Sequence, residues 1–467
     1  MSASADSYRD QLYNTDESGR RIGFFPKRPK GRFYNRRILV SVILLVIFFG
    51  LPWLKYNGQP FFMLNFIERK FILFGQVFMP QDFLLLALLV IALFYFIFVF
   101  TSVLGRIWCG WTCPQTIFLE MVYRRIEYWI EGNSTKQRKL AKADWKWEKI
   151  WKRTLKHGIF IAIAAAVSHT VMGFFLGMDN VLLYVQEGPK EHLVTFLFVV
   201  GNTGAFYAVF SWFREQACIY VCPYGRLQGV LLNKNSLVIS YDHVRGEPRG
   251  KIKRNDPNPD LGDCIDCKQC VAVCPTGIDI RNGTQLECVN CTACIDACDE
   301  IMDKVGRPRG LVRYASQEQI ESGKPFKLTA QAYVYAVGLL LVSAVFLVLL
   351  IGSSDIKATL LRAPGQTYTM TPEGNVTNLY TIKVLNKTSD ERALDLRLEG
   401  VEGKLTLLGG EQLELPANGM GEASILVELP PSELKGLSFD VDIQLLENGE
   451  AIETIGTTIN GPMLPKK

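Results

Sequence analysis

Five stretches of the chain are long and apolar enough to cross a lipid bilayer, at residues 38–54, 83–104, 158–178, 193–213 and 332–354. A helix needs about 20 apolar residues to cross the hydrocarbon core. Because a bilayer offers no water to the backbone, each stretch is predicted to be a helix that satisfies its own peptide groups. A sixth apolar stretch, 61–80, is interrupted by Glu68, Arg69 and Lys70 and is expected to be an interfacial or re-entrant piece. These spans therefore predict a helical membrane domain.

Lysine and arginine gather on one side of the predicted spans. Nine precede the first span and twelve lie between the second and third, from Arg106 to Lys156, whereas only Lys190 lies between the third and fourth. Loops rich in basic residues stay in the cytoplasm. We therefore expect a cytoplasmic N-terminus and an external C-terminus. A long polar tail precedes the first span, so no cleavable signal peptide is expected.

Two cysteine runs between the fourth and fifth spans share the spacing C-x2-C-x2-C-x3-C, namely CIDCKQCVAVC at 264–274 and CVNCTACIDAC at 288–298. This is the spacing of two-cluster bacterial ferredoxins, in which the fourth cysteine of each run ligates the other cluster. The pattern predicts two [4Fe–4S] clusters. The first is expected on Cys264, Cys267, Cys270 and Cys298, and the second on Cys288, Cys291, Cys294 and Cys274.

The alternative of structural zinc does not fit this spacing, because a zinc site takes four ligands in two pairs. Asp299 stands where the ferredoxin pattern has proline after the second run, a departure that affects the turn and not the ligand count. Reduced thiolates are maintained in the cytosol. The clusters and the basic loops therefore predict the same side of the membrane for this segment.

The four remaining cysteines form two C-x-x-x-C-P pairs, Cys109 with Cys113 and Cys218 with Cys222, each followed by proline. Each pair follows an even-numbered span, so both are expected at the cytoplasmic edge of the membrane. Residues four apart on a helix share a face, so each pair can present two sulfurs to one ion if the helix continues through it. Pro114 and Pro223 fit if the pair ends one helix or opens the next. Buried free cysteines can also be purely structural.

The residues after the fifth span change character. Alternating stretches such as NLYTIKVLNKT and FDVDIQLLE are separated by Gly, Asn and Pro. This pattern predicts an immunoglobulin-like β-sandwich, for which docking or assembly is the expected role. Within the third predicted span, His169 is a candidate functional residue, because ionisable side chains inside spans often are; a neutral packing role is the alternative.

The expected protein is therefore a multi-domain membrane protein with five α-helical spans, an inserted two-cluster ferredoxin-like segment and a C-terminal all-β sandwich. Its parts are expected to be a cytoplasmic tail, a four-span membrane domain with a basic cytoplasmic loop, a cytoplasmic segment with the ferredoxin-like domain at about 255–305, a fifth transmembrane helix and a periplasmic domain. Their bounds are 1–37, 38–213 with the loop 105–157, 214–331, 332–354 and 355–467.

Taken together, these motifs resemble the FixG/RdxA/CcoG family of cytochrome c oxidase accessory proteins. The resemblance covers nearly the whole chain, including WCGWTCPQT and CIYVCPYGRLQ around the thiol pairs. It implies a protein of the bacterial inner membrane that reduces Cu(II) to Cu(I) for assembly of cbb3-type oxidase. Soft thiolates favour Cu(I), so Cys109, Cys113, Cys218 and Cys222 are the expected copper ligands and catalytic residues.

Two other functions remain open. The chain could be a quinol-oxidising subunit related to the membrane polyferredoxin of nitrate reductase, or a non-enzymatic assembly factor. The absence of a second histidine within the predicted spans weakens the quinol alternative. Expected partners are the membrane, copper, and the oxidase assembly machinery or copper chaperones, with an unidentified electron donor and no nucleic acid. Whether the chain forms a homodimer is left open.

Overall fold

The computed structural model describes residues 23–79, 82–251, 261–352, 354–365, 367–388, 390–417, 419–434 and 436–462. The chain divides into two compact units. The first comprises residues 1–53 and 83–346, and the second comprises residues 54–82 and 347–467. Each unit is described by itself.

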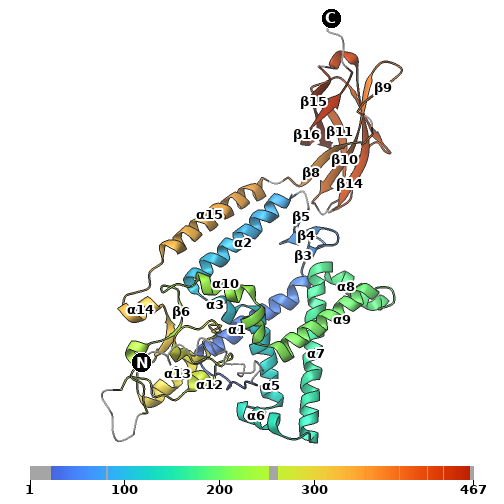
Figure 1. Ribbon diagram of the computed structural model, residues 1–467. Helices are drawn as coiled ribbons and strands as arrows, with labels where there is room; N and C mark the ends of the chain where they lie inside the picture. The colour runs from blue at the N-terminus through green and yellow to red at the C-terminus, as the bar shows by residue number, and fades with distance from the viewer. Residues whose placement is uncertain are drawn as a thin grey trace. The chain divides into compact units, whose positions relative to one another are not determined.

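Five helices of the described chain are long and apolar enough to cross a membrane, as the sequence predicted (Figure 1). They are α1 (Arg32–Gly50) extended by η1 (Leu51–Trp53), α2 (Phe83–Leu104), α7 (Trp147–Leu176), α9 (Leu193–Ala208) extended by the π-helix η4 (Val209–Phe213), and α15 (Ala330–Ile351). α7 begins well before the predicted boundary. Trp147 and Trp151 therefore belong to the same continuous helix as the third predicted span.

Short helices fill the connections between the spans. The predicted basic loop is helical for much of its length, in α3 (Ile107–Trp111), α4 (Pro114–Thr116), the π-helix η3 (Ile117–Tyr123), α5 (Arg124–Ile130) and α6 (Ser134–Lys142). α8 (Met178–Glu187) joins α7 to α9. After α9 come the π-helix η5 (Ala217–Val221) and α10 (Pro223–Leu231).

The ferredoxin-like segment is closed by a pair of strands outside the expected 255–305. β6 (Val238–Tyr241) pairs antiparallel with β7 (Val312–Ala315). Between them lie α11 (His243–Gly246), α12 (Gln269–Ala272), η6 (Ile280–Asn282) and α13 (Ala293–Val305), and α14 (Gln317–Ser322) follows β7. Apolar residues from both strands and from α13 form one core with the cysteines. Residues 252–260, which include the start of the expected segment 255–305, lie outside the described residues.

The first span is anchored to the ferredoxin-like segment through Asp296, a residue of α13. Its carboxylate accepts the backbone N–H groups of Phe33 and Tyr34 at 3.1 and 2.8 Å, in the first turn of α1. These N–H groups have no partner within their own helix, so the carboxylate acts as a cap supplied from elsewhere in the chain. Gly31 permits this approach, because a Cβ there would lie 2.3 Å from the Asp296 side chain.

The second unit contains the predicted β-sandwich. One sheet has the order β12-β14-β10-β8, with β9 also paired to β10, and the other has the order β13-β11-β15-β16. The strands are β8 (Ile356–Arg362), β9 (Thr369–Met370), β10 (Val376–Asn386), β11 (Arg392–Glu399), β12 (Lys404–Leu408), β13 (Leu413–Leu415), β14 (Met420–Leu429), β15 (Ser438–Glu447) and β16 (Glu450–Asn460), with η7 (Pro431–Glu433) before β15.

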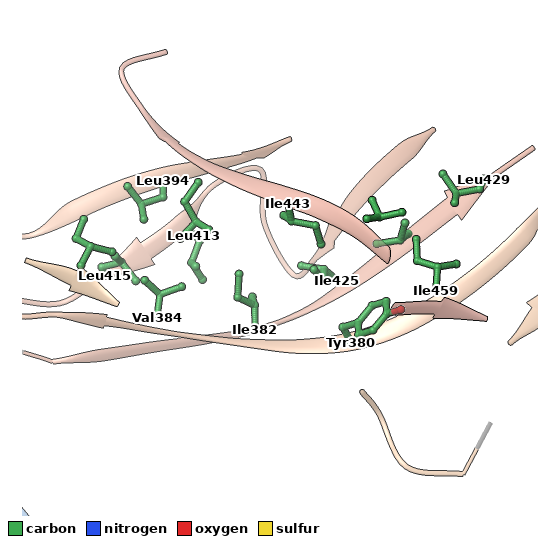
Figure 2. Packing of buried hydrophobic residues seen from close by; sticks show 14 residues of the cluster. Tyr380, Ile382, Val384, Leu394, Leu413, Leu415, Ile425, Leu429, Ile443 and Ile459 are labelled. Atoms are coloured by element: carbon green, nitrogen blue, oxygen red, sulfur yellow. The ribbon is translucent and has the colours of Figure 1, made fainter. Parts of the chain in front are cut away.

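Alternate residues of the two sheets fill the sandwich core (Figure 2). Ile382, Ile425 and Ile443 are fully buried there. The hydroxyl of Tyr380, whose ring lies in this core, donates to the carbonyl of Thr458 at 2.8 Å. The burial pattern confirms the immunoglobulin-like prediction, since period-two alternation buries one face of each strand.

The stretch 61–80 differs from expectation. It forms a three-stranded antiparallel sheet of β3 (Phe62–Asn65), β4 (Lys70–Leu73) and β5 (Gln76–Phe78), preceded by the pair β1 (Lys55–Tyr56) and β2 (Gln59–Pro60). Glu68 and Arg69 lie in the turn between β3 and β4, and Lys70 is the first residue of β4. These charges therefore belong to a sheet and not to an interfacial or re-entrant piece. This sheet belongs to the second unit, where buried Asp82 pairs with Lys357 and Lys387.

Candidate iron–sulfur and thiol sites

One cavity is lined by the four cysteines expected for the first cluster, Cys264, Cys267, Cys270 and Cys298. The first three approach along the loop that enters α12, and the fourth comes from α13. Cys267 is exposed, whereas Cys264 and Cys270 are buried. The cavity therefore has one edge at the protein surface.

A second cavity is lined by the four cysteines expected for the second cluster, Cys274, Cys288, Cys291 and Cys294. Cys270 also borders it, so the two cavities are neighbours. The fourth cysteine of each run thus faces the cavity of the other run, which is the exchange that the sequence spacing predicts.

The backbone around the two cavities repeats. Asp266 and Lys268 in the first run have φ of 52° and 56°, and Asn290 and Thr292 at the matching places in the second run have φ of 50° and 65°. Such conformations are unfavourable for residues other than glycine. Backbone turns that contain left-handed residues can form a concave nest of N–H groups, a geometry that binds anions and iron–sulfur clusters. The strained loops therefore fit a bound cluster.

Burial disfavours the charged form of three of these thiols. It raises the pKa of Cys270, Cys288 and Cys298 to about 12. Thiols in this state stay protonated at neutral pH, and only a bound cation makes the thiolate favourable. Four thiol donors around each cavity, together with the left-handed turns that the two runs share, fit two [4Fe–4S] clusters.

The two C-x-x-x-C-P pairs share one local structure. Cys109 lies in the short helix α3 and Cys218 in the short helix η5. In each pair the second cysteine is extended, with ψ of 124° at Cys113 and 110° at Cys222, and proline is the first residue of the next helix. Each pair therefore lies where one helix ends and the next begins, which is the condition under which Pro114 and Pro223 fit. No single helix runs through either pair, so the two sulfurs of a pair do not share one helical face.

The four thiols of these pairs converge. Every one of the six pairings among Cys109, Cys113, Cys218 and Cys222 is close enough to raise a thiol pKa electrostatically. Burial is the larger cause, and together they raise the pKa of Cys109 to about 11 and of Cys218 to about 12. The buried amide of Gln228 lies 3.3 Å from the Cys109 sulfur. We call these four residues the thiol site.

Across the part of the chain that the structure describes, no three Cys, His, Asp or Glu side chains are already gathered around the position of a single metal ion. The thiol site is therefore an assembly of four nearby soft donors. Such donors suit Cu(I) or an iron–sulfur cluster better than Mg²⁺ or Ca²⁺, which take oxygen ligands.

The thiol site packs directly on the loop of the second cluster. A Cβ added at Gly110, next to Cys109, would lie 2.3 Å from the carbonyl oxygen of Asn290 and 2.7 Å from that of Val289. Both carbonyls lie between Cys288 and Cys291. Backbone therefore meets backbone between the thiol site and the second cavity.

Two buried arginines hold the thiol site and the second cavity together. Arg37 donates to the carbonyls of Gly110 and Cys291, both at 2.9 Å. Arg106 donates to the carbonyl of Gly225 in α10 at 2.9 Å and also contacts the carbonyl of Leu286. The positive charge of Arg106 lowers the pKa of both Cys109 and Cys288, so one guanidinium serves both groups of thiols.

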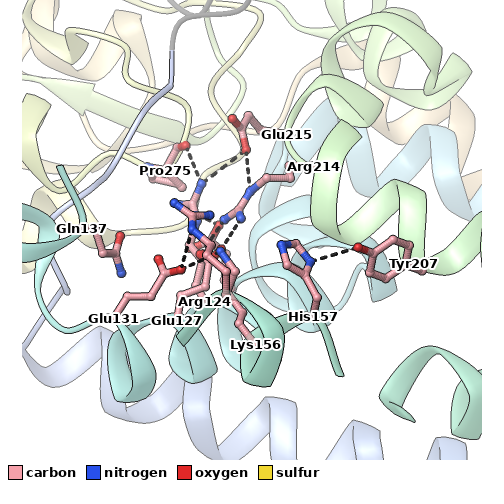
Figure 3. A network of polar contacts seen from close by, with 12 residues as sticks. Arg124, Glu127, Glu131, Gln137, Lys156, His157, Tyr207, Arg214, Glu215 and Pro275 are labelled. Atoms are coloured by element: carbon pink, nitrogen blue, oxygen red, sulfur yellow. Dashed lines mark hydrogen bonds and ion pairs between the residues drawn. The ribbon is translucent and has the colours of Figure 1, made fainter. Parts of the chain in front are cut away.

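A buried ionic network adjoins the second cavity (Figure 3). Arg124 donates to the carbonyl of Pro275, directly after Cys274, at 3.1 Å and pairs with Glu215. Arg214 has φ of 53° and binds Glu127 through two hydrogen bonds of 2.7 and 3.0 Å. Burial raises the pKa of Glu127, but Arg214, Lys156 and Arg124 outweigh it and lower it to about 2. Glu127 is therefore a carboxylate at neutral pH.

Sequence reasoning missed most of these supporting residues. Arg37, Arg106 and Arg124 counted only as cytoplasmic positive charge, yet their side chains are at most 5% exposed. Gln228 gave no signal at all, since its role depends on the distance between α3 and α10. One available signal was Gly110, which sits between the two cysteines of a pair where a helix former would be expected.

Three family models match the chain. The "4Fe-4S dicluster domain" matches residues 213–317, the "4Fe-4S binding domain" matches residues 86–137, and the "IG-like fold at C-terminal of FixG" matches residues 346–462. The first match includes both cysteine runs and the second thiol pair. In residues 86–137, the only cysteines are Cys109 and Cys113. The chain thus carries 4Fe–4S binding domains, and one of them covers half of the thiol site.

Three curated proteins are similar over most of their length. RdxB of Cereibacter sphaeroides is 35% identical over 83% of this chain and 83% of its own. RdxA of the same organism is 33% identical over 92% and 94%. The nitrogen fixation protein FixG of Rhizobium meliloti is 31% identical over 86% and 83%.

Proposed function

We propose, from the premise that this chain belongs to the FixG/RdxA family of membrane iron–sulfur electron-transfer proteins, that its acceptor is Cu(II) and its product is Cu(I). The copper would bind at the thiol site and be delivered for assembly of a cbb3-type cytochrome c oxidase. The observation that carries this proposal is the backbone contact of Gly110 with the second-cluster loop.

In this proposal the cysteines divide into three groups. Cys264, Cys267, Cys270 and Cys298 hold one cluster, and Cys274, Cys288, Cys291 and Cys294 hold the other. When bound, the clusters supply single electrons, which is what the step from Cu(II) to Cu(I) takes up. The thiol site favours the reduced ion because sulfur donors are soft, and Arg106 and Arg37 offset the negative charge of the thiolates.

The orientation derived from the basic loops completes the proposal. The N-terminus and the segment 214–331 lie in the cytoplasm, and the sandwich lies in the periplasm of a bacterial inner membrane. Reduced copper would then leave the thiol site at the cytoplasmic edge. The oxidase assembly machinery or a copper chaperone would receive it, with the sandwich as a docking surface.

A second candidate for the thiol site is a third iron–sulfur cluster. The "4Fe-4S binding domain" match favours it, because its only cysteines are Cys109 and Cys113. Four thiolates are also the usual ligand number of a [4Fe–4S] cluster. The chain would then pass electrons through the thiol site and not to copper bound there.

One experiment separates the two candidates. The parent protein, a Cys109→Ser/Cys113→Ser variant and a Thr112→Ala control are purified anaerobically, and iron and copper are counted per chain. Thr112 lies between the two cysteines, and its hydroxyl bonds only to the carbonyl of Trp108 among the described residues. Each protein is then reduced with dithionite, freed of excess and mixed with Cu(II) and a Cu(I) chelator.

The copper proposal predicts about eight irons per chain in all three proteins, four for each cluster. It also predicts that Cu(I) formation is lost only in the double variant. About twelve irons in the parent, with four lost in the double variant, would instead establish the third cluster. Equal copper binding and reduction in all three proteins would show that the thiol site is structural.

A further inference from the structure

A lipid-accessible cavity lies at the end of the bundle where α8 joins α7 to α9. Most of its lining is apolar, with Met172 from α7, Val181 and Val185 from α8, and Phe196 and Val199 from α9. Val185 and Phe196 are exposed, so the cavity is bounded by side chains that would face lipid in a membrane. A ligand that enters it would therefore come from the bilayer and carry a large apolar part.

Two histidines bring polar groups to this apolar cavity. His169 on α7 and His192, directly before α9, both line it. From the sequence, His192 does not count as a second histidine within a span, because it directly precedes the predicted span 193–213. Folding of α8 back against the bundle brings the two imidazoles to one cavity.

His169 is arranged as a hydrogen-bond acceptor. Its Nδ1 lies 2.8 Å from the carbonyl oxygen of Ala165. A carbonyl only accepts, so Nδ1 carries the hydrogen and Nε2 carries the lone pair. None of the residues that the structure describes hydrogen-bonds to Nε2.

His192 is paired with a carboxylate. Its Nε2 lies 2.5 Å from Glu187 Oε2, and its ring lies over Tyr184 with centroids 4.0 Å apart. In the neutral imidazole, the carboxylate accepts from Nε2 and Nδ1 is left as an acceptor on the other side of the ring. The cavity is therefore lined by two imidazoles that, when neutral, each offer one acceptor nitrogen, and one of them is paired with a carboxylate.

We propose that this cavity binds the head group of a lipid-soluble quinol, the electron donor of the protein. A quinol is an apolar planar ring with two hydroxyl groups on opposite sides, which match two imidazole acceptors across an apolar cavity. A metal ion fits less well, because none of the described His, Cys, Asp and Glu residues form a group of three here.

The number of electrons that a quinol releases matches the acceptors in the rest of the chain. This match rests on the proposed copper reduction. A quinol gives up two electrons and two protons and becomes a quinone. One proton passes to His169 and one to His192 with Glu187. The two electrons match two one-electron clusters and the reduction of two Cu(II) ions.

The interior between the cavity and the second cluster is packed with aromatic side chains. His169 and Lys156 are 13 residues apart on α7, which corresponds to about 20 Å of helix. Over this interval Phe160 packs on Tyr123, which stacks on Phe210 with centroids 4.9 Å apart. Electrons released in the cavity would pass this aromatic core to reach the side of the bundle where Arg124 meets Pro275.

The test uses full-length protein in lipid nanodiscs with decylubiquinone as the probe. Val181 is buried in the cavity wall, whereas Val194 is 83% exposed on α9. Val181→Trp fills the cavity, and Val194→Trp is the matched control. The measured quantity is the quinone retained by the protein after the retention of protein-free nanodiscs is subtracted. We expect Val181→Trp to lower it at least tenfold and Val194→Trp to leave it unchanged.

Anaerobic addition of decylubiquinol gives a second measurement. Bleaching of the cluster absorbance should be at least tenfold slower in Val181→Trp and His169→Leu than in the parent, while dithionite bleaches all of them fully. Equal retention and equal bleaching in Val181→Trp and the parent would overturn the proposal. If dithionite but not decylubiquinol reduces the parent, and the reduced parent then reduces Cu(II), the quinol site alone would be refuted. If decylubiquinol reduces the clusters of the parent but Cu(II) is not reduced, the copper proposal alone would be refuted.

Discussion

Replacing Gly110 with alanine tests the contact between the thiol site and the second cluster. The new Cβ would lie 2.3 Å from the Asn290 carbonyl oxygen, with the Asn290 carbonyl carbon and the Val289 oxygen both at 2.7 Å. All three atoms are backbone, so no side chain can rotate away. The two segments must separate by about 1 Å to reach ordinary contact, an overpacking that costs about 1–3 kcal/mol.

This separation also breaks the bridge that Arg37 makes, since its hydrogen bonds to Gly110 and Cys291 are both 2.9 Å long. We expect Gly110→Ala to keep its full iron content, because no cluster ligand changes. It should unfold at a lower temperature than the parent, and its dithionite-reduced clusters should be reoxidised more slowly by Cu(II). Stopped-flow absorbance and a thermal unfolding scan measure the two effects.

The control is Gly158→Ala. Gly158 lies within α7, and an added Cβ meets nothing within 4 Å. Alanine is favoured over glycine inside a helix by about 1 kcal/mol, so this variant should be as stable as the parent or more stable. If Gly110→Ala matches Gly158→Ala in stability and in reoxidation rate, the close approach is not needed and the reasoning fails.

Three further outcomes are expected. Cys267→Ala and Cys291→Ala should each lose iron and visible absorption, and a double variant with about eight irons per chain would disprove the ligand assignment. Because the pKa of Glu127 is lowered from 4.5 to about 2, its stabilisation is complete above pH 4.5 and is lost as the pH falls towards 2. The parent should therefore lose about 3 kcal/mol more than Glu127→Gln over that interval, and parallel unfolding curves would contradict this. A reporter active only outside the cytoplasm should work when fused after residue 354 and fail within 215–325; the reverse would invert the proposed topology.

The parts predicted well from sequence are those in which one local pattern determines the structure. A run of about 20 apolar residues in a bilayer has to be a helix, and alternation in the C-terminal segment has to bury one face of each strand. Cysteine spacing is a local pattern in part, since the first three cysteines of each run line one cavity and the fourth lines the cavity of the other run. Even so, the left-handed backbone conformations of Asp266 and Asn290 could not be foreseen, because only the nearby cluster cavities explain the energetic cost of these conformations.

The parts predicted poorly depend on contacts between distant segments. Residues 61–80 looked like a membrane piece because their apolar content was read without the turn that their charges form between β3 and β4. His169 and His192 looked unrelated because α8 brings them together only in the folded chain. A residue count along the sequence contains no information on such distances.

The buried arginines have a physical reason to lie where they do. When the thiols of the thiol site and of the second cavity lose their protons, two negative groups lie near each other in space, in surroundings where burial already disfavours charge. Like charges at short range in a low dielectric repel strongly. Arg106, buried between them, lowers the pKa of thiols on both sides, and Arg37 does the same for Cys291. If the thiol site binds a metal as proposed, these cations offset the repulsion between its thiolates and those of the second cavity.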